Sequence, residues 1–260
     1  MNILEKEMIS TLRYLKEECG CFQIKAEFEA EGTRMSELMR LKDITSVVDL
    51  PIIMKIGGVE SVTDVYNCLQ IGVASIIAPM VETPFALKKY AYMIKNLVPA
   101  DNAEDIDFYF NMETITGYQN FDKMMQLPEL QYINGVTIGR VDLSWSMDKE
   151  RSEVDSEEFF GICENTFRMA REKKLECGLG GAISTKSINF IKRLKQERLI
   201  DKFETRKVVF AADAVDRGED ILKHALIFEL QWLKSKRRFY SGIRKEDEAR
   251  IAMLEQRLNG

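Results

Sequence analysis

The chain has 260 residues, of which 45% are hydrophobic and 30% are charged, and its formal net charge is -5 at pH 7. This mildly acidic balance disfavours nucleic acid as the main partner, because phosphate backbones attract an excess of positive charge. No stretch reaches the roughly 18 apolar residues of a membrane span, and the charged start MNILEKEMIS lacks the apolar core of a signal peptide. We therefore expect a cytoplasmic protein with one α/β domain over residues 1–260.

The cysteine and histidine content limits which catalytic and metal-binding sites the chain can form. The five cysteines form no Cys-x-x-Cys pair, and a chain of this length needs no disulfides, so we expect buried thiols in a reducing compartment. His224 is the only histidine, and it falls inside the apolar helix expected near residues 221–233. The sequence thus excludes a Ser-His-Asp triad, a histidine-rich zinc site and a histidine general base at the strand ends.

Hydrophobic periodicity predicts helices and strands in alternation along the chain. An amphipathic helix is expected over residues 1–18. Strands are expected at 22–31, 51–57, 75–81, 106–113, 135–142, 175–181 and 203–212. Helices are expected at 35–48, 61–71, 84–97, 118–127, 155–174, 186–199 and 220–235, with a charged C-terminal helix at 244–258. Because nearly every strand precedes a helix, the pattern indicates a parallel sheet, and the number of strands favours a closed TIM (β/α)8-like barrel over an open sheet.

The stretch FYFNMETITG, residues 108–117, ends a strand with an acid. Apolar Phe108, Phe110 and Met112 alternate with more polar neighbours at the two-residue period of a strand, and turn and helix-start residues follow Glu113. We therefore expect Glu113 at the carboxyl end of a buried strand. In β/α folds this is the edge where the chemistry takes place.

Polar and charged side chains also interrupt the other apolar strands. They are Glu27, Glu29, Lys55, Asn111, Arg140, Asp142, Glu204 and Arg206. A lone buried charge costs several kcal/mol, so these groups must pair with one another or face a ligand at the barrel mouth. One interpretation is an internal salt-bridge network, and the other is an anion site that contains a metal ion.

The residue types favour a metal site. Glu113 and Asp142 end two strands with no histidine or thiol pair nearby, which indicates an all-oxygen site suited to Mg²⁺ or Mn²⁺. Lys55, Arg140 and Arg206 would provide positive charge for a carboxylate or an enolate.

Four segments, taken together, resemble a known family. They read PIIMKIGGVES, IGVASIIAPMVET, NMETITGYQNFD and GVTIGRVDLSWSM, and in this order over about residues 27–184 they are similar to the HpcH/HpaI aldolase and citrate lyase family. The resemblance implies a TIM barrel that binds a divalent ion, chelates a pyruvate-like 2-oxo acid and makes or breaks a carbon-carbon bond through the enolate. Glu113 and Asp142 match the two metal ligands, and Lys55 replaces an arginine beside the enolate oxygen.

Several positions depart from this family pattern. The glutamate-histidine pair after the family's second strand reads Glu31-Gly32 here, so the histidine base is missing, and Gln70 replaces its acid partner. Arg140 replaces the proline of the family's Gly-Pro-Ala-Asp-Leu. The family's first strand has no obvious counterpart, so an atypical or missing first strand is expected, with a barrel incomplete at its N-terminal edge.

We therefore expect a metal-dependent carbon-carbon lyase, aldolase or condensing enzyme that acts on pyruvate, a related 2-oxo acid or an acyl carboxylate. The expected catalytic residues are Lys55, Arg140, Glu29 and Glu31, with one of the glutamates or a metal-bound water moving the proton. The expected substrate-binding residues are Lys55, Arg140, Arg206 and Gly139.

Alternatives remain open at this point. Lys55 could act as a Schiff-base nucleophile with a depressed pKa. The chain could be a citrate-lyase-like acyl-CoA lyase, with residues 178–181 approaching a phosphate, although a tight turn into the following helix is the favoured explanation of these glycines. It could also be a non-catalytic barrel that binds a metabolite or a partner protein.

The predicted tail helix, residues 244–260, bears on assembly. This helix is too amphipathic to remain free in solution, so we expect it to dock on its own barrel or on a neighbouring subunit. The family resemblance, with its exchange of C-terminal helices, implies a homo-oligomer.

Overall fold

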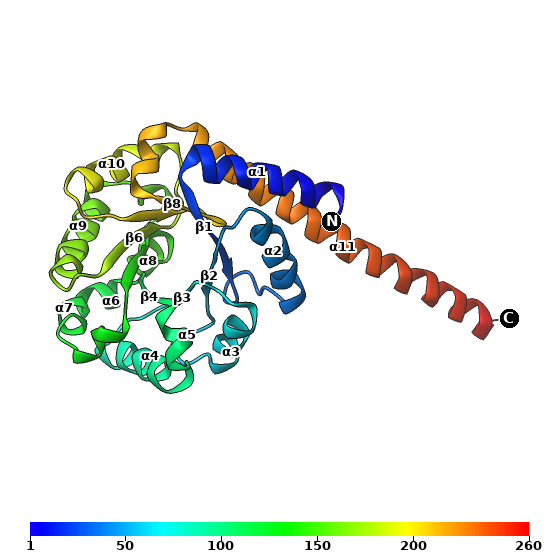
Figure 1. The fold of residues 1–260 in the computed structure, drawn as a ribbon, viewed down its shortest axis with the longest axis horizontal. Coiled ribbons are helices and arrows are strands. Elements are labelled where there is room, and N and C mark those ends of the chain that lie inside the picture. The colour runs from blue at the N-terminus through cyan, green and yellow to red at the C-terminus, as the bar shows by residue number, and fades with distance from the viewer. Residues whose placement is uncertain (260) are drawn as a thin grey trace.

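The computed structural model describes residues 1–259 and contains eight strands closed into a barrel, with helices around the outside (Figure 1). The strands are β1 (Cys21–Glu27), β2 (Ile52–Lys55), β3 (Ser75–Ala78), β4 (Asp107–Met112), β5 (Gly135–Gly139), β6 (Glu176–Gly180), β7 (Lys202–Glu204) and β8 (Val208–Ala211). The prediction of a TIM-like barrel is therefore confirmed.

The longer helices follow the strands in the predicted order. They are α1 (Ile3–Cys19), α2 (Met35–Val47), α3 (Val62–Ile71), α4 (Pro84–Leu97), α9 (Glu157–Glu172), α10 (Ile188–Gln196) and α11 (Asp220–Asn259). The short helices are α5 (Ala100–Glu104), α6 (Ile115–Gln119), α7 (Phe121–Met124) and α8 (Arg140–Ser146), with 3-10 turns η1 (Pro128–Tyr132), η2 (Arg151–Glu153), η3 (Thr185–Ser187) and η4 (Ala212–Arg217). Among the residues that the structure describes, no helix is both long and apolar enough to cross a membrane.

The barrel closes through an antiparallel strand. Strands β1 to β7 pair in parallel, but the predicted strand at 203–212 is in fact two strands, β7 and β8, which form a hairpin. Thr205 stabilises the turn, because its hydroxyl accepts from the backbone N–H of Val208 at 3.1 Å. Strand β8 also pairs antiparallel with β1, so it fills the gap between β7 and β1. The expected incompleteness at the N-terminal edge is corrected, because this last strand completes the ring.

Helices α1 and α11 lie side by side across one flank of the barrel (Figure 1). Asn2 and Glu5 form a capping box at the start of α1, and Gly20, with φ 73°, ends the helix before β1. Helix α11 is continuous where the sequence predicted two helices, 220–235 and 244–258, because Gly242 does not interrupt it. Its distal half extends away from the barrel, and the final residue of the predicted tail, Gly260, lies outside the described residues.

The barrel interior contains a small apolar cluster and several buried polar side chains. Ile53, Ile77, Tyr109 and Val209 form a small apolar cluster near the amino ends of the parallel strands. Two residues further along β2 and β4, on the same inward face, come Lys55 and Asn111. On β2 and β4 the inward face therefore becomes polar toward the carboxyl ends, where a ligand can reach it.

Candidate functional site

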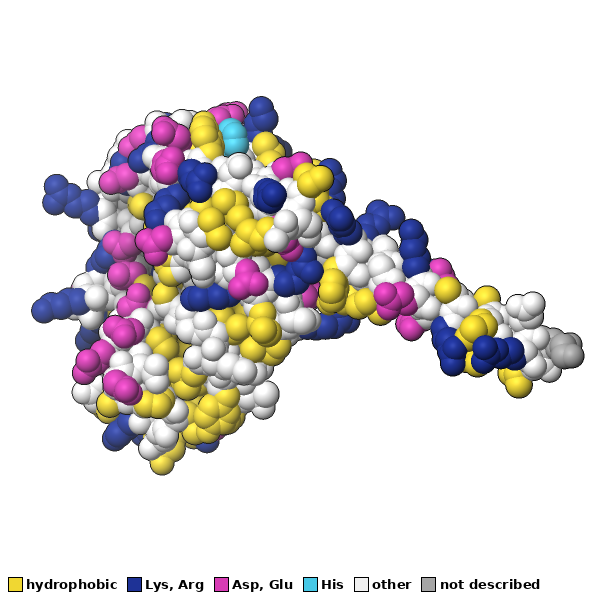
Figure 2. Space-filling model, turned by 45° about the vertical axis from the view of Figure 1, so that its right-hand side comes forward, with side chains coloured by type: hydrophobic (Ala, Val, Ile, Leu, Met, Phe, Trp, Pro, Cys, Tyr) yellow, Lys and Arg dark blue, Asp and Glu magenta, His cyan; other side chains and the backbone are white. Residues whose placement is uncertain are grey.

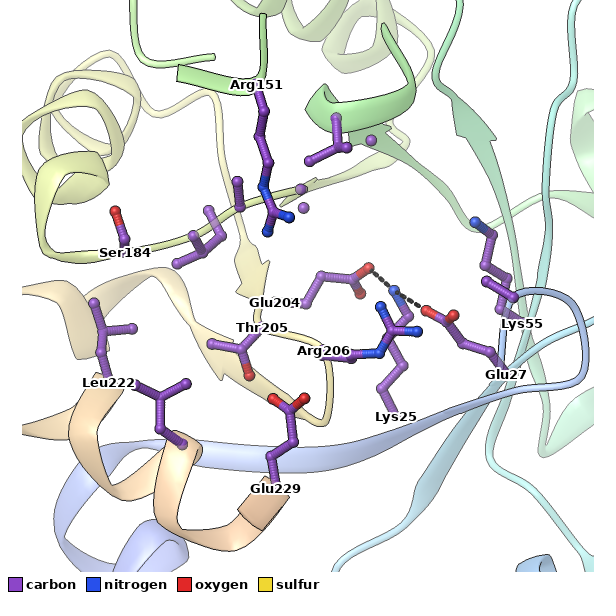
Figure 3. Close-up of a pocket in the computed structure, with 18 of the residues that line it drawn as sticks. Lys25, Glu27, Lys55, Arg151, Ser184, Glu204, Thr205, Arg206, Leu222 and Glu229 are labelled. Carbon is purple, nitrogen blue, oxygen red and sulfur yellow. Dashed lines mark hydrogen bonds and ion pairs between the residues drawn. The ribbon is translucent and has the colours of Figure 1, made fainter. Parts of the chain in front are cut away.

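A large cavity opens at the carboxyl ends of the parallel strands, with a volume of about 1150 Å³ (Figure 3). Its inner wall is made of residues that end six of these strands or follow them directly: Lys25, Glu27, Lys55, Asn111, Glu113, Gly139, Gly180 and Glu204. The sequence thus brings polar groups from distant segments to one edge, since carboxyl ends of parallel strands meet there.

Glu113 is the most deeply enclosed acid at this edge, with 2% of its surface exposed. Its Oε1 accepts from the backbone N–H of Met80 at 3.0 Å, and its Oε2 accepts from Nδ2 of Asn111 at 3.0 Å. Lys55 Nζ lies 3.4 Å from the carboxylate. Burial raises the pKa of Glu113 and the charge of Asp142 raises it further, although Lys55 and the hydrogen bonds oppose the shift. The carboxylate therefore lies where another cation would stabilise it.

Gly139 on β5 has no side chain, and the Glu113 carboxylate occupies the space that this leaves. A Cβ atom at residue 139 would lie 2.4 Å from Oε2 of Glu113, which is closer than real Cβ contacts allow. Asp142 follows in the first turn of α8 and lines the same cavity. Glu113, Gly139 and Asp142, predicted as metal and substrate residues, therefore meet in one place.

The donor set at this place fits a hard divalent cation. Two carboxylates and the amide oxygen Oδ1 of Asn111 are present, and this buried Oδ1 has no hydrogen-bond partner among the described residues. Mg²⁺ and Mn²⁺ prefer such oxygen ligands. Within residues 1–259 no group of three or more His, Cys, Asp or Glu side chains is arranged to hold a metal, so the remaining ligands would be water or substrate oxygens.

Lys55 connects this acidic group to Glu29. Its Nζ lies 2.8 Å from Glu29 Oε2, and both side chains line the cavity. Burial would lower the pKa of Lys55, but Glu113 and Glu29 raise it above the ordinary value. Because the amine stays protonated, this environment opposes the Schiff-base alternative, which needs a depressed pKa.

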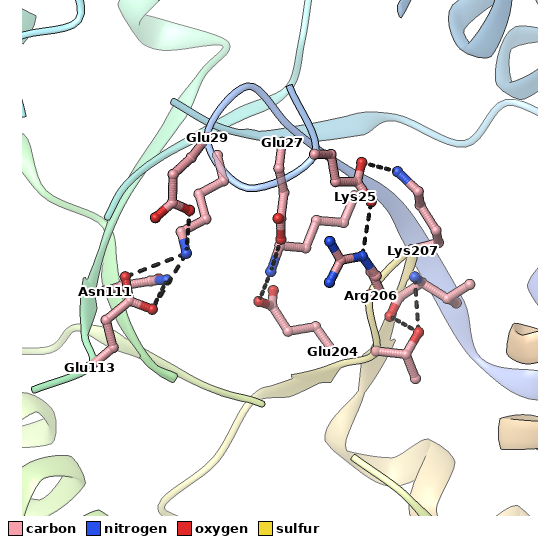
Figure 4. Close-up of polar contacts among 12 residues, drawn as sticks. Lys25, Glu27, Glu29, Asn111, Glu113, Glu204, Arg206 and Lys207 are labelled. Atoms are coloured by element: carbon pink, nitrogen blue, oxygen red, sulfur yellow. Dashed lines mark hydrogen bonds and ion pairs between the residues drawn. The ribbon is translucent and has the colours of Figure 1, made fainter. Parts of the chain in front are cut away.

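A second ion-pair cluster lies beside the first, between Glu113 and Arg206 (Figure 4). Lys25 Nζ lies 2.5 Å from Glu204 Oε1 and 3.2 Å from Glu27 Oε1. Burial opposes the charge of Lys25, but the two carboxylates outweigh it and raise the pKa of this lysine. Gly180 leaves room for Glu204, since a Cβ there would lie 3.1 Å from its Oε1.

Sequence reasoning did not assign Lys25, Glu27 or Glu204 to the site. Glu27 and Glu204 were expected only as charges inside the barrel with no named role, and Lys25 was not among those charges, whereas all three side chains line the cavity. The sequence did contain a signal for this cluster. Buried charges must be paired, and one lysine on the first strand could pair with acids on the first and seventh strands.

Arg140 does not line the cavity, and the expectation for it needs correction. Its side chain is fully buried, and its N–H groups donate to the carbonyls of Gly180, Gly181 and Val154, to Asp155 and to the hydroxyl of Ser187. The predicted strand ran to residue 142, but α8 already begins at Arg140, and this turns the side chain away from the barrel interior. All the donors of the guanidinium are thus used to join loops.

Glu31 was expected to act as a base and Arg206 to bind substrate, but only Arg206 lines the cavity. Glu31 accepts from Lys207 and, at 3.3 Å, from Nε of Arg206, and it is not among the cavity residues. Arg206 does line the cavity, with 52% of its side chain exposed. Of the two glutamates proposed to move a proton, only Glu29 therefore faces the cavity.

The residues expected to have no chemical role lie outside this region. His224 is on α11, stacks on Tyr14 with ring centroids 4.3 Å apart, and contacts Asp220. All five cysteines are buried free thiols.

Known structures share this fold. No protein family model matches the chain, and no curated protein matches it in sequence. The crystal structure of citrate synthase SbnG superposes with a TM-score of 0.64 at 15% identity and covers 91% of both chains. An HpcH/HpaI aldolase/citrate lyase family protein from Burkholderia cenocepacia J2315 gives 0.60 at 11% identity, over 92% of this chain and 90% of its own. Macrophomate synthase gives 0.55 at 13% identity, over 92% and 82%.

These likenesses extend over nearly the whole chain and include a member of the family that the sequence motifs resemble. At such low identities they establish a common fold. The resemblance found in the sequence is therefore confirmed at the level of the fold, and the chemistry rests on the residues of the cavity.

Proposed function

We propose that this protein is a carbon-carbon lyase, aldolase or condensing enzyme that acts through the enolate of pyruvate or a related 2-oxo acid. The observation that carries the proposal is the buried Glu113 beside Asp142 at the carboxyl edge of the barrel, with an unpartnered Asn111 Oδ1 nearby. Solved structures of this fold that are named as a citrate synthase and an aldolase/citrate lyase family protein support the reaction class.

Glu113 and Asp142 would hold the Mg²⁺ or Mn²⁺ ion, with Asn111 as a further oxygen donor. A bound divalent ion would supply positive charge that stabilises a developing enolate, an effect of several kcal/mol in such sites. Lys55 stays protonated and can donate a hydrogen bond to a carboxylate or enolate oxygen of the substrate.

Glu29 is the residue we propose as the proton acceptor that replaces the missing histidine. It faces the cavity, with 25% of its side chain exposed, and Lys55 fixes its position at 2.8 Å. In the condensing direction the methyl proton of pyruvate moves to Glu29, the resulting carbon nucleophile bonds to a carbonyl carbon as the C=O π electrons pass to its oxygen, and that oxygen takes the proton from Glu29. The lyase direction reverses these steps, with Glu29 returning the proton.

A second candidate is a barrel that binds a metabolite without turning it over. It is favoured by the pairing of the two inner lysines, Lys25 and Lys55, with carboxylates, which would make the polar floor stable without a substrate. The two candidates differ in whether the site makes an enolate.

Proton NMR of pyruvate in deuterated buffer tests the proposal. We expect loss of the methyl signal with added Mg²⁺ or Mn²⁺, no loss with chelated protein, and no loss with Glu113→Gln, because the variant lacks one metal ligand. Glu17→Gln, an exposed substitution on α1, is the matched control and should exchange like the wild type. Binding of Mn²⁺, followed by electron paramagnetic resonance, provides a readout that does not depend on turnover. Tight binding of 2-oxo acids without exchange under any metal condition would favour the binding barrel instead.

A further inference from the structure

The outer half of the cavity has no role in the chemistry described above. With about 1150 Å³ the cavity exceeds the roughly 300–1,000 Å³ of typical small-molecule pockets, so a three-carbon acid would fill only its inner part. The outer wall is formed by Arg151, Ile183, Arg206, Leu222, Leu226 and Leu230. These residues come from η2, from the loop after β6, from the β7–β8 turn and from α11.

Two arginines in this outer half have donors available for a ligand. Arg151 makes no ion pair or side-chain hydrogen bond with any residue in 1–259, and its side chain extends into the cavity (Figure 3). Arg206 enters from the opposite side, and its single acceptor, Glu31, is shared with Lys207. The inner cations Lys25 and Lys55 differ, because carboxylates already surround them.

The loop after β6 adds backbone donors to the same wall. The N–H groups of Gly181, Ala182 and Ile183 have no acceptor in the described part of the chain, and all three residues line the cavity. Gly181 and Ala182 have φ values of 82° and 53°, a conformation that is uncommon for alanine. Unpaired backbone N–H groups beside an arginine are suited to an oxyanion.

The remaining wall, formed by α11, combines leucines with charged side chains. Leu222, Leu226 and Leu230 recur every four residues on the cavity side of α11, with Leu226 64% and Leu230 52% exposed. The same helix also presents Glu219 and Glu229 to the cavity, along with Lys223 and Asp220. Because these acids repel an anion, a ligand would place its charged end at the arginines and its apolar body along α11.

We propose that the outer half of the cavity binds the second reactant, an electrophile with a carboxylate at one end of an apolar body. Its role as a reactant rests on the proposed function, whereas its binding does not. Arg151 and Arg206 hold the carboxylate, the backbone of residues 181–183 donates to it, and the leucines of α11 contact the apolar body.

Fluorine NMR titration with two matched, unreactive probes tests this binding. The probes are 4-(trifluoromethyl)benzoate and 4-(trifluoromethyl)benzyl alcohol, which share the apolar body and differ in charge. We expect the benzoate to bind more tightly to the wild type, and Arg151→Gln and Arg206→Gln each to weaken it about tenfold through loss of a charge-assisted hydrogen bond. The alcohol should be unaffected by either change. Arg13→Gln, at an exposed position on α1, is the control and should bind both probes like the wild type.

Equal affinity for the two probes, or benzoate binding that neither cavity variant weakens, would overturn the proposal. Tighter binding of the matching arylphosphonate, by tenfold or more, would overturn the assignment of the group as a carboxylate. Pyruvate exchange separates this proposal from the proposed function. Arginine-dependent benzoate binding without exchange sustains the outer site alone, and exchange without such binding sustains only the enolate chemistry.

Discussion

Gly139 determines, at the scale of one residue, how closely the backbone of β5 approaches Glu113. We predict that Gly139→Ala retains the fold but weakens Mn²⁺ binding at least about tenfold, because the new methyl group must displace Oε2 from a position only 2.4 Å away. Isothermal titration calorimetry with Mn²⁺ measures the effect. Gly161→Ala, in the middle of α9 with no atom within 4 Å of the added Cβ, is the control and should leave binding unchanged. Unchanged affinity in Gly139→Ala would place the metal away from Glu113.

Lys202, at the amino end of β7, is a buried lysine that makes stability depend on pH. Its Nζ lies 3.2 Å from the centroid of the Tyr109 ring, and burial lowers the pKa of Lys202 to about 8, although Glu176 and other acids oppose the shift. In the unfolded chain the lysine pKa is near 10.5. Between these two values the unfolded state binds more protons, so stability from this group rises with pH, and below pH 8 the full cost of burying the charge is present.

We therefore predict that Lys202→Met raises the free energy of unfolding at pH 7, by about 3 kcal/mol at most, and that the gain shrinks as the pH approaches 10. Urea unfolding of both proteins at several pH values measures the difference. Lys6→Met, at an exposed position of α1, controls for the change of net charge. A gain that stays constant between pH 7 and pH 10 would show that the charge on Lys202 is not its source.

At the scale of elements, the sequence predicted the first six parallel strands, but it did not predict the hairpin of β7 and β8. The strands predicted at 75–81 and 135–142 begin at the same residues as β3 and β5, because glycine and proline bound these apolar runs, but each observed strand ends three residues earlier. The turn at residues 205–207 contains no glycine, proline or asparagine, so nothing local marked the reversal between β7 and β8. The antiparallel strand β8 forms because the barrel needs a strand between β7 and β1 in order to close. This requirement arises from the tertiary structure and leaves no local signal in the sequence.

In the candidate site, too, some residues could be predicted from the sequence and others could not. Glu113, Gly139 and Asp142 were predictable because each ends a strand or directly follows one, where the parallel topology fixes the location. Arg140 was not, since α8 begins one residue after Gly139 and changes the direction of the next side chain. Lys25 and Glu204 were missed as partners because their pairing joins the first and seventh strands, 179 residues apart.

At the scale of the whole molecule, the distal half of α11 stands out from the barrel (Figures 1 and 2). Ile243, Ile251, Leu254 and Leu258 are exposed there, with Leu258 at 84%. The first half is held in place, since Tyr240 donates to Glu37 at 2.7 Å and Lys236 pairs with the same carboxylate. Helices without tertiary packing are marginal in water, so the distal half requires a partner surface, and we propose a second copy of this chain.

We predict that the full chain forms a homo-oligomer and that Ile251→Glu combined with Leu254→Glu shifts it toward a monomer, because the new charges would be buried at the interface. Size-exclusion chromatography with light scattering measures the mass. A matched variant on the same segment, Arg250→Gln with Glu255→Gln, changes exposed polar residues and should keep the wild-type mass. Since the same α11 supplies Leu226 and Leu230 to the cavity mouth, an assembly that fixes this helix would also stabilise the outer binding wall. A monomeric wild type would contradict this prediction, because the projecting half of α11 would then have no role in assembly. The cavity would in that case function within one chain.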